Sequence, residues 1–227
     1  MRGLFVTGTD TGVGKTVLAA AIVAALRADG HQVTALKPLI TGLDESPDPV
    51  WPRDHELLAQ MAGATPDQVA LLSYGPPVSP QLAAELGGAP IDPAALLAGI
   101  RAAAARSSGP LVVEGVGGLL VPLTDGYDVR ALAQELELPL LIAARPGLGT
   151  INHTLLTLEA ARHAELRVAG VVLTPWPDDP DEIARSNRDT IERLGGVAVS
   201  VLPELAGPER VALAAAGARL PLASWLA

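Results

Sequence analysis

The chain has 227 residues, of which 49% are hydrophobic and 18% are charged, so it can bury a sizeable core and is too apolar to be disordered. Its 25 acidic residues outnumber its 16 basic ones and give a formal net charge of −9, which leaves little electrostatic basis for binding nucleic acid or an anionic membrane. The absence of cysteine excludes disulfides, thiolate zinc sites and cysteine nucleophiles.

The first apolar run, residues 1–6, turns polar at Thr7 and is too short for the core of a signal peptide. Apolar stretches such as residues 138–144 are far below the roughly 18 residues that a membrane span needs. We therefore expect a soluble, cytoplasmic protein with small-molecule partners and no nucleic-acid or membrane partner.

Short β-branched runs alternate with longer Ala/Leu-rich stretches of helical spacing, a pattern typical of repeated βα units. In chain order the expected strands span residues 3–7, 32–37, 111–114, 140–144, 168–174 and 198–202. The expected helices span residues 15–29, 54–62, 93–106, 129–137, 150–164, 181–194 and 208–216. Loops rich in Pro, Gly and Asp are expected at residues 42–52, 74–80 and 174–181. The pattern predicts one α/β domain over residues 1–227, with a mainly parallel sheet flanked by helices.

Residues 8–16, Gly-Thr-Asp-Thr-Gly-Val-Gly-Lys-Thr, follow the first expected strand and open the first helix. Backbone amides there can cradle phosphates, Lys15 can neutralise them, and the Thr16 hydroxyl can hold magnesium. Gly8 lies one residue earlier than in the strict motif, and the alternative is an ordinary strand–turn–helix junction. The segment predicts a P-loop NTPase-like fold with a nucleoside triphosphate site, without distinguishing a kinase, ligase, switch or motor.

Only Lys15 and Lys37 are lysine, and the other basic residues are arginine. Lys37 ends the second expected strand and Pro38 turns the chain away, which puts an ammonium at the ligand edge of the sheet. A lysine that merely faces solvent is the alternative. With no lysine beyond Lys37, the Asn-Lys-x-Asp motif of guanine-specific switches is excluded.

Two acidic residues complete the candidate site. Glu114 ends an apolar strand before a glycine-rich segment, in the position of a Walker-B acid, and Asp54 stands at the start of a helix. Magnesium prefers hard oxygen ligands, so Thr16, Asp54 and Glu114 are its candidate ligands. For Asp54 a simple helix cap is the alternative.

These segments together resemble dethiobiotin synthetase, an enzyme family of biotin synthesis. The matching segments follow the family's order and span most of the chain: residues 8–16, Lys37-Pro38, Asp54, Ser79-Pro80, residues 114–122 and residues 149–154. The off-register Gly8 is part of this match. The resemblance implies an ATP-dependent cyclo-ligase that joins 7,8-diaminononanoate and CO2 through a carbamate and a carbamic–phosphoric anhydride, closing a cyclic urea.

The resemblance also implies the roles of individual residues. Lys15 and Lys37 would be catalytic, stabilising charge on the transferring phosphoryl group and the carbamate. Nucleotide contacts would come from Gly12, Val13, Gly14, Lys15, Thr16, Val17, Asp54, Glu114, Gly115, Val116, Gly117, Thr174, Pro175, Pro203, Glu204 and Leu205. Contacts to the diamine and its carbamate would come from Thr11, Lys37, Thr41, Ser79, Gly117, Gly118, Thr150, Ile151, Asn152 and Asn187. Residues 149–152, and Asn187 with them, would serve the neighbouring subunit's site in a homodimer.

The sequence departs from the family at three positions. Thr174 replaces the asparagine that usually reads the base, so we expect relaxed selectivity, with another nucleotide such as CTP competing with ATP. Gln81 stands where many relatives carry histidine, and Asn187 where an aromatic residue is frequent.

Other functions compete with this hypothesis. A partition- or scaffold-type P-loop ATPase usually has a second lysine inside the loop and a basic or amphipathic surface, and the sequence shows neither. An amidotransferase would normally need a catalytic cysteine, and the sequence has none. For His153 we expect a packing or surface role, for the three tryptophans packing, and for residues 203–205 either a base contact or simple chain reversal.

Overall fold

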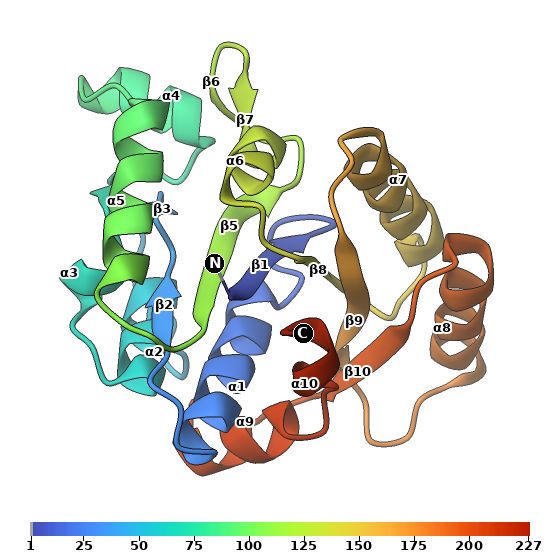
Figure 1. Cartoon of the computed structure of the whole chain (residues 1–227). Helices are drawn as coiled ribbons and strands as arrows, with labels where there is room; N and C mark the ends of the chain where they lie inside the picture. Colours follow the sequence, from blue (N-terminus) through green and yellow to red (C-terminus); the bar gives the residue numbers. More distant parts are fainter. Residues whose placement is uncertain (1) are drawn as a thin grey trace.

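The computed structural model describes residues 2–227. Six strands form one parallel sheet in the order β10-β9-β8-β1-β5-β2 (Figure 1). They are β1 (Gly3–Gly8), β2 (Thr34–Leu36), β5 (Leu111–Gly118), β8 (Leu140–Ala144), β9 (Val168–Trp176) and β10 (Val199–Pro203). Two small pairs lie outside this sheet, parallel β3 (Leu39–Ile40) with β4 (Leu72–Ser73), and antiparallel β6 (Pro122–Thr124) with β7 (Tyr127–Asp128).

Helices cover both faces of the sheet because its strands are apolar on both sides. The helices are α1 (Lys15–Ala28), α2 (Asp54–Ala62), α3 (Pro66–Val69), α4 (Pro80–Gly87), α5 (Pro93–Ala105), α6 (Val129–Leu136), α7 (Thr150–His163), α8 (Glu182–Gly195), α9 (Arg210–Gly217) and α10 (Leu222–Trp225). In β1, Leu4 and Val6 face the core that holds α1, α2 and α9, whereas Phe5 faces the core that holds α5, α6 and α7. The expected parallel α/β sheet flanked by helices is confirmed.

The six expected strands and seven expected helices are present, but two of the strands extend further than predicted. The glycine-rich segment after Glu114 continues β5 as far as Gly118, which pairs with Gly8 of β1. The segment after Thr174 continues β9 to Trp176, which pairs with Pro203. In both places pairing with a neighbouring strand outweighs the loop preference of Gly or Pro.

Helix α1 lies in the middle of one layer and is buried from Leu18 to Leu26. Its alanine-rich surface lets α9 approach closely. A Cβ atom placed on Gly217 of α9 would lie 2.1 Å from the Ala21 carbonyl oxygen of α1. The close contact between α1 and α9 therefore requires glycine at position 217.

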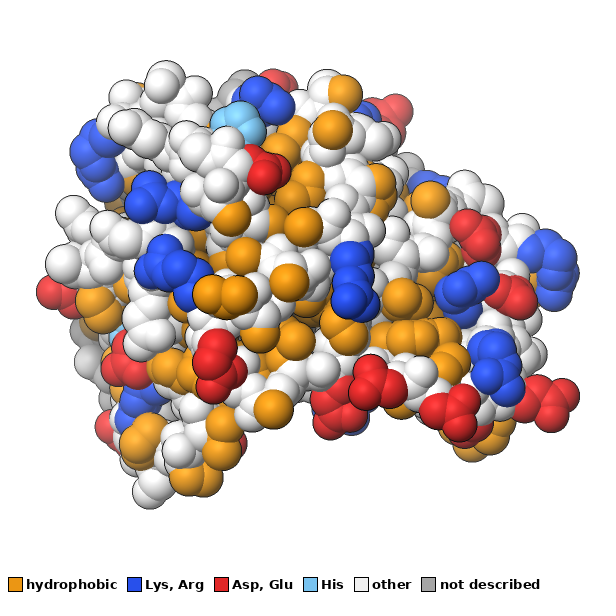
Figure 2. Space-filling view, turned by 90° about the horizontal axis from the view of Figure 1, so that it is seen from below, with side chains coloured by type: hydrophobic (Ala, Val, Ile, Leu, Met, Phe, Trp, Pro, Cys, Tyr) orange, Lys and Arg blue, Asp and Glu red, His pale blue; other side chains and the backbone are white. Residues whose placement is uncertain are grey.

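The face seen from below mixes charges of both signs. Figure 2 shows acidic and basic side chains interspersed around apolar ones on this face. Among residues 2–227, none of the helices combines the length and the apolar character that a bilayer crossing requires.

Candidate active site

The phosphate loop joins β1 to α1. Gly14 has a φ of 89°, and a Cβ atom there would lie 2.9 Å from Cγ2 of Thr174, so the position requires glycine on both counts. Lys15 begins α1, is 6% exposed and donates through Nζ to the Asp10 carbonyl oxygen at 2.8 Å. The loop thus curls over its own lysine, which lies at the amino end of a buried helix.

Four side chains from four segments meet beside this loop. Lys37, which directly follows β2, donates to Oε1 of Glu114 at 2.6 Å and to Oδ2 of Asp54, the first residue of α2. Thr16 donates through Oγ1 to the same Glu114 oxygen at 2.8 Å. The sequence predicted these residues separately, and the fold brings them together at the carboxyl ends of the strands.

Lys37 and Glu114 are the buried members of this cluster, whereas the Asp54 side chain is 45% exposed. Lys37 is 5% exposed and Glu114 is 1% exposed. Oε2 of Glu114 is buried and has no hydrogen-bond partner among the described residues. A buried carboxylate oxygen without a partner is costly, so this atom is suited to a ligand that brings a positive charge or a donor.

The two alternatives that the sequence left open are wrong for this structure. Lys37 does not face solvent, because its ammonium lies between two carboxylates. Asp54 does not cap α2, because Arg53 occupies the N-cap position and the Asp54 carboxylate pairs with Lys37.

The charges in the cluster shift one another's pKa values. Burial lowers the pKa of Lys15 to about 8, although Glu114 opposes the shift. Burial also disfavours the charged form of Lys37, but the carboxylates of Glu114 and Asp54 outweigh it and raise the pKa of Lys37. Burial raises the pKa of Glu114 against the opposing effect of Lys37. Lys37 is therefore held firmly as a cation, while Lys15 loses its proton more readily than an ordinary lysine does.

The glycines of β5 lie against the phosphate loop. Gly118 pairs with Gly8, and Gly117 has a φ of 61°. A Cβ atom on Gly118 would lie 3.5 Å from the Gly8 carbonyl oxygen and 4.0 Å from that of Thr9. This part of β5 can thus bring its backbone close to whatever the phosphate loop holds.

The predicted substrate residues are spread around this centre. Thr41 and Asp54 both line a cavity of about 300 Å³ formed by the loop after β3. Thr11 and Ser79 are exposed, and Ser79 takes the N-cap position of α4. In the first turn of α7, the Thr150 side chain is buried, whereas Ile151 is half-buried and Asn152 is exposed.

Asn187 has a contact within the chain. Its side chain is buried in α8, and Nδ2 donates to the carbonyl oxygens of Pro146 at 2.8 Å and Gly147 at 3.1 Å. Both carbonyls belong to the loop between β8 and α7. The predicted contact of Asn187 with substrate stays a prediction.

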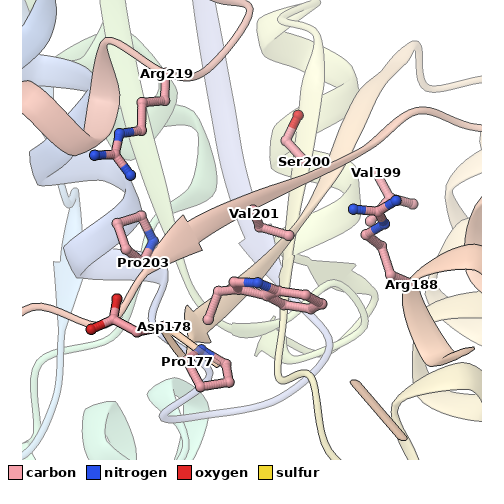
Figure 3. Close-up of a pocket in the computed structure, with 9 residues that line it drawn as sticks. Pro177, Asp178, Arg188, Val199, Ser200, Val201, Pro203 and Arg219 are labelled. Carbon is pink, nitrogen blue, oxygen red and sulfur yellow. The ribbon is translucent and has the colours of Figure 1, made fainter. Parts of the chain in front are cut away.

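The segments predicted to read the base lie side by side. The amide of Glu204 donates to the Trp176 carbonyl oxygen at 2.9 Å, which joins the end of β10 to the end of β9. Thr174 itself is buried against Gly14. A cavity of about 350 Å³ opens next to these strand ends, and Figure 3 shows Arg188 and Arg219 on either side of β10 there.

Comparison with known proteins identifies the family. A family model described as an AAA domain matches residues 2–208. An ATP-dependent dethiobiotin synthetase of Mycolicibacterium gilvum is 41% identical over 208 residues, covering 91% of this chain and 89% of that protein. Its counterpart in Anaeromyxobacter dehalogenans is 45% identical, covering 86% of each chain. The chain belongs to the dethiobiotin synthetase family. The counterpart in Bacillus subtilis is 37% identical over 91% of this chain and 89% of that protein.

Solved structures extend the similarity of this dethiobiotin synthetase family member to more distant P-loop proteins. A ParA family ATPase of Chlorobium tepidum has a TM-score of 0.55 at 14% identity, covering 97% of this chain and 100% of that one. A cobyrinic acid a,c-diamide synthase of Mycobacterium smegmatis, solved with an ATP analogue and magnesium, has a TM-score of 0.52 at 16% identity, covering 95% and 92%. These similarities show the shared fold.

Three further side chains complete the description of this dethiobiotin synthetase family member. Gln81 donates through Nε2 to Oδ1 of Asp125 at 2.9 Å. His153 is exposed, as expected for a surface residue. Sequence reasoning missed Arg145, which directly follows β8 and reaches the phosphate loop, because no motif marks a lone arginine after a strand.

Proposed function

We propose that this chain is an ATP-dependent cyclo-ligase that forms the ureido ring of dethiobiotin from 7,8-diaminononanoate and CO2. The observation that carries the proposal is the buried Lys37 between Asp54 and Glu114, next to the phosphate loop. The proposal is supported by 37–45% identity to relatives named for this activity. No nucleophilic side chain is required by the reaction.

The proposed reaction proceeds in three steps. One amine of the diamine adds to CO2 and loses a proton, giving a carbamate. A carbamate oxygen then attacks the γ-phosphorus of ATP, and the bond to ADP breaks. The second amine attacks the carbonyl carbon of the mixed anhydride and loses a proton, so that the ring closes and phosphate leaves.

Two cations of the chain stabilise the charge that moves in these steps. Lys15 binds the β- and γ-phosphate oxygens from the start of α1, and Lys37 lies where the carbamate and the γ-phosphate meet. The raised pKa of Lys37 keeps it protonated throughout, so it acts by charge and not as a proton donor. Backbone amides of Gly117 and Gly118 would hold the carbamate.

Magnesium fits the oxygen atoms present. The hydroxyl of Thr16 and the carboxylates of Asp54 and Glu114 are hard ligands, and Oε2 of Glu114 has no other partner among the described residues. When bound, magnesium would neutralise the phosphate oxygens and orient them. Triphosphate oxygens would complete its coordination.

We further propose a homodimer in which the α7 amino terminus of one subunit completes the other's site. Leu148, just before α7, is 95% exposed, and Leu120, next to the β5 glycines, is 55% exposed. Apolar side chains so exposed around a site are suited to burial by a second copy. Sedimentation equilibrium at several concentrations tests this, and a monomer at all of them would contradict it.

The experiment that tests the reaction is a coupled phosphate-release assay. Complete mixtures contain MgATP, the diamine and bicarbonate, and each is omitted in turn. We expect phosphate only in the complete mixture, together with a product whose mass is that of the cyclic urea. Phosphate release that does not depend on the diamine would overturn the proposal and favour a partition- or scaffold-type ATPase. That class usually has a second lysine in the phosphate loop, whereas this loop contains Lys15 alone.

We expect Asp54→Asn to shift the magnesium titration of activity to higher concentration by about tenfold or more, because the variant loses an anionic oxygen ligand. Asp67→Asn is the matched control, since Asp67 also lies in the first turn of a helix but is exposed and has no ion-pair partner among residues 2–227. Activity measured against free magnesium checks the result. A wild-type curve for Asp54→Asn would remove this residue from the metal site.

We expect relaxed base selectivity in the wild-type enzyme. An asparagine can donate to and accept from adenine at once, whereas Thr174 offers one hydroxyl that lies against Gly14, and Pro175 has no amide hydrogen. Loss of such a paired contact lowers discrimination by about 1–3 kcal/mol. Values of kcat/KM for ATP, CTP, GTP and UTP at equal magnesium test this. A strong preference for ATP over all three would assign base reading to the backbone near residues 203–205.

A further inference from the structure

A second basic side chain reaches the phosphate loop from outside the motif. Arg145 is the first residue after β8, and Nη2 of its guanidinium donates to the Gly12 carbonyl oxygen at 3.2 Å. The close approach depends on glycine at position 12, where a Cβ atom would lie 3.2 Å from the same Nη2 atom and φ is 69°. β8 carries Arg145 to this place because its neighbour β1 leads directly into the loop, with the Thr9 amide donating to the Ala143 carbonyl oxygen at 3.0 Å.

The charge of Arg145 is not neutralised within the chain. Throughout residues 2–227, no carboxylate lies within 4.0 Å of its guanidinium. A guanidinium carries five N–H donors, and the Gly12 carbonyl engages one nitrogen of an otherwise exposed side chain. Its remaining donors are thus available to a ligand on the loop.

The backbone next to Arg145 is held by hydrogen bonds from α8. Asn187 of α8 is buried and donates to the carbonyl oxygens of Pro146 and Gly147, the next two residues. A loop held by a buried amide presents its side chain at a smaller entropic cost than a free loop does. The arrangement is that of a positioned cation beside the phosphate site.

We propose that Arg145 binds an anionic oxygen of a reactant held on the phosphate loop. The oxygen belongs either to the triphosphate or to the carboxylate of the diamino acid, and guanidinium suits both because it donates two parallel hydrogen bonds. The carboxylate assignment rests on the proposed function, whereas the phosphate assignment requires only nucleotide binding.

Arg145→Gln and Arg145→Lys test the proposal against Arg106→Gln, which removes an exposed arginine at the end of α5. Calorimetric titration with MgATP gives Kd, and steady-state assays give KM for the diamino acid and for the same vicinal diamine without its carboxylate. Circular dichroism checks that each variant is folded.

We expect Arg145→Gln to raise either the Kd for MgATP or the KM for the diamino acid by about tenfold. This is the effect of losing a charge-assisted hydrogen bond at an exposed site. A rise in Kd for MgATP would show that Arg145 binds an oxygen of the triphosphate. A rise in KM for the diamino acid alone, with the KM of the carboxylate-free diamine unchanged, would show that Arg145 binds the substrate carboxylate. Values within twofold of those of Arg106→Gln for all three ligands would overturn the proposal. If wild-type protein binds MgATP but shows no diamine-dependent turnover, the proposed function fails while the nucleotide titration still tests Arg145.

Discussion

Lys37→Arg is expected to lower kcat by about a hundredfold or more while leaving the Kd for MgATP within a few fold of wild type. The ammonium of Lys37 lies in a buried space between Asp54 and Glu114, at 2.6 Å from Oε1 of the latter. A planar guanidinium keeps the charge but is too wide for that space and directs its donors differently. Nucleotide binding rests mainly on the phosphate loop, which the substitution does not touch.

The matched comparison is Lys15→Arg, which changes the lysine inside the phosphate loop itself. That variant is expected to lose both turnover and nucleotide affinity, because the proposed role of Lys15 is to contact the phosphates in the ground state as well as during transfer. Single-turnover rates and calorimetric Kd values separate the two effects. Near-normal turnover by Lys37→Arg would show that the charge cluster serves folding and not the reaction.

Gly217→Ala is expected to destabilise the protein by about 3 kcal/mol. The new methyl group would lie 2.1 Å from the Ala21 carbonyl oxygen, a backbone atom in the interior of α1 that cannot move without disturbing the helix. For a chain of this size the loss corresponds to a fall in Tm of roughly 6–12 °C. Because α1 begins at the phosphate loop, nucleotide affinity is expected to fall as well.

Gly87→Ala in α4 is the helix-matched control. A Cβ atom there would meet only Cδ1 of Tyr74, at an ordinary contact distance of 3.6 Å. Because alanine is a better helix former than glycine, this variant is expected to be neutral or more stable by up to about 1 kcal/mol. Urea unfolding of both variants checks the difference, and equal midpoints would show that α9 can shift on α1.

The sheet could be predicted from the sequence because its strands are short, β-branched and buried on both faces. The elements that were not predicted carry weaker signals. The pairs β3–β4 and β6–β7 have strands of two or three residues, too short for any periodicity to emerge. Helix α4 begins at Pro80, whose proline also marks a loop, and the four-residue helices α3 and α10 bury too little to leave a pattern.

In the candidate site, too, some residues could be predicted from the sequence and others could not. Lys15, Thr16 and Glu114 could be predicted because each stands at a fixed offset from a strand. Whether Asp54 is a helix cap or a partner of Lys37 could not be decided, since both arrangements place an aspartate at the start of a helix. The Asn187 contact depends on how α8 packs against the loop after β8, and the Arg145 contact depends on the pairing of β8 with β1. Both are tertiary relations without a local signal.

The two lysines also give the protein an unusual chemical profile toward amine-directed reagents. Its only side-chain amines belong to Lys15 and Lys37, and both lie in the site. The low pKa of Lys15, about 8, makes this amine unprotonated and nucleophilic at a lower pH than an ordinary lysine, whereas Lys37 stays protonated and inert. Of the two lysines, a small acylating reagent would therefore mark Lys15 in preference to Lys37, and bound nucleotide would shield it, so labelling of Lys15, located by peptide mass, becomes a gauge of site occupancy.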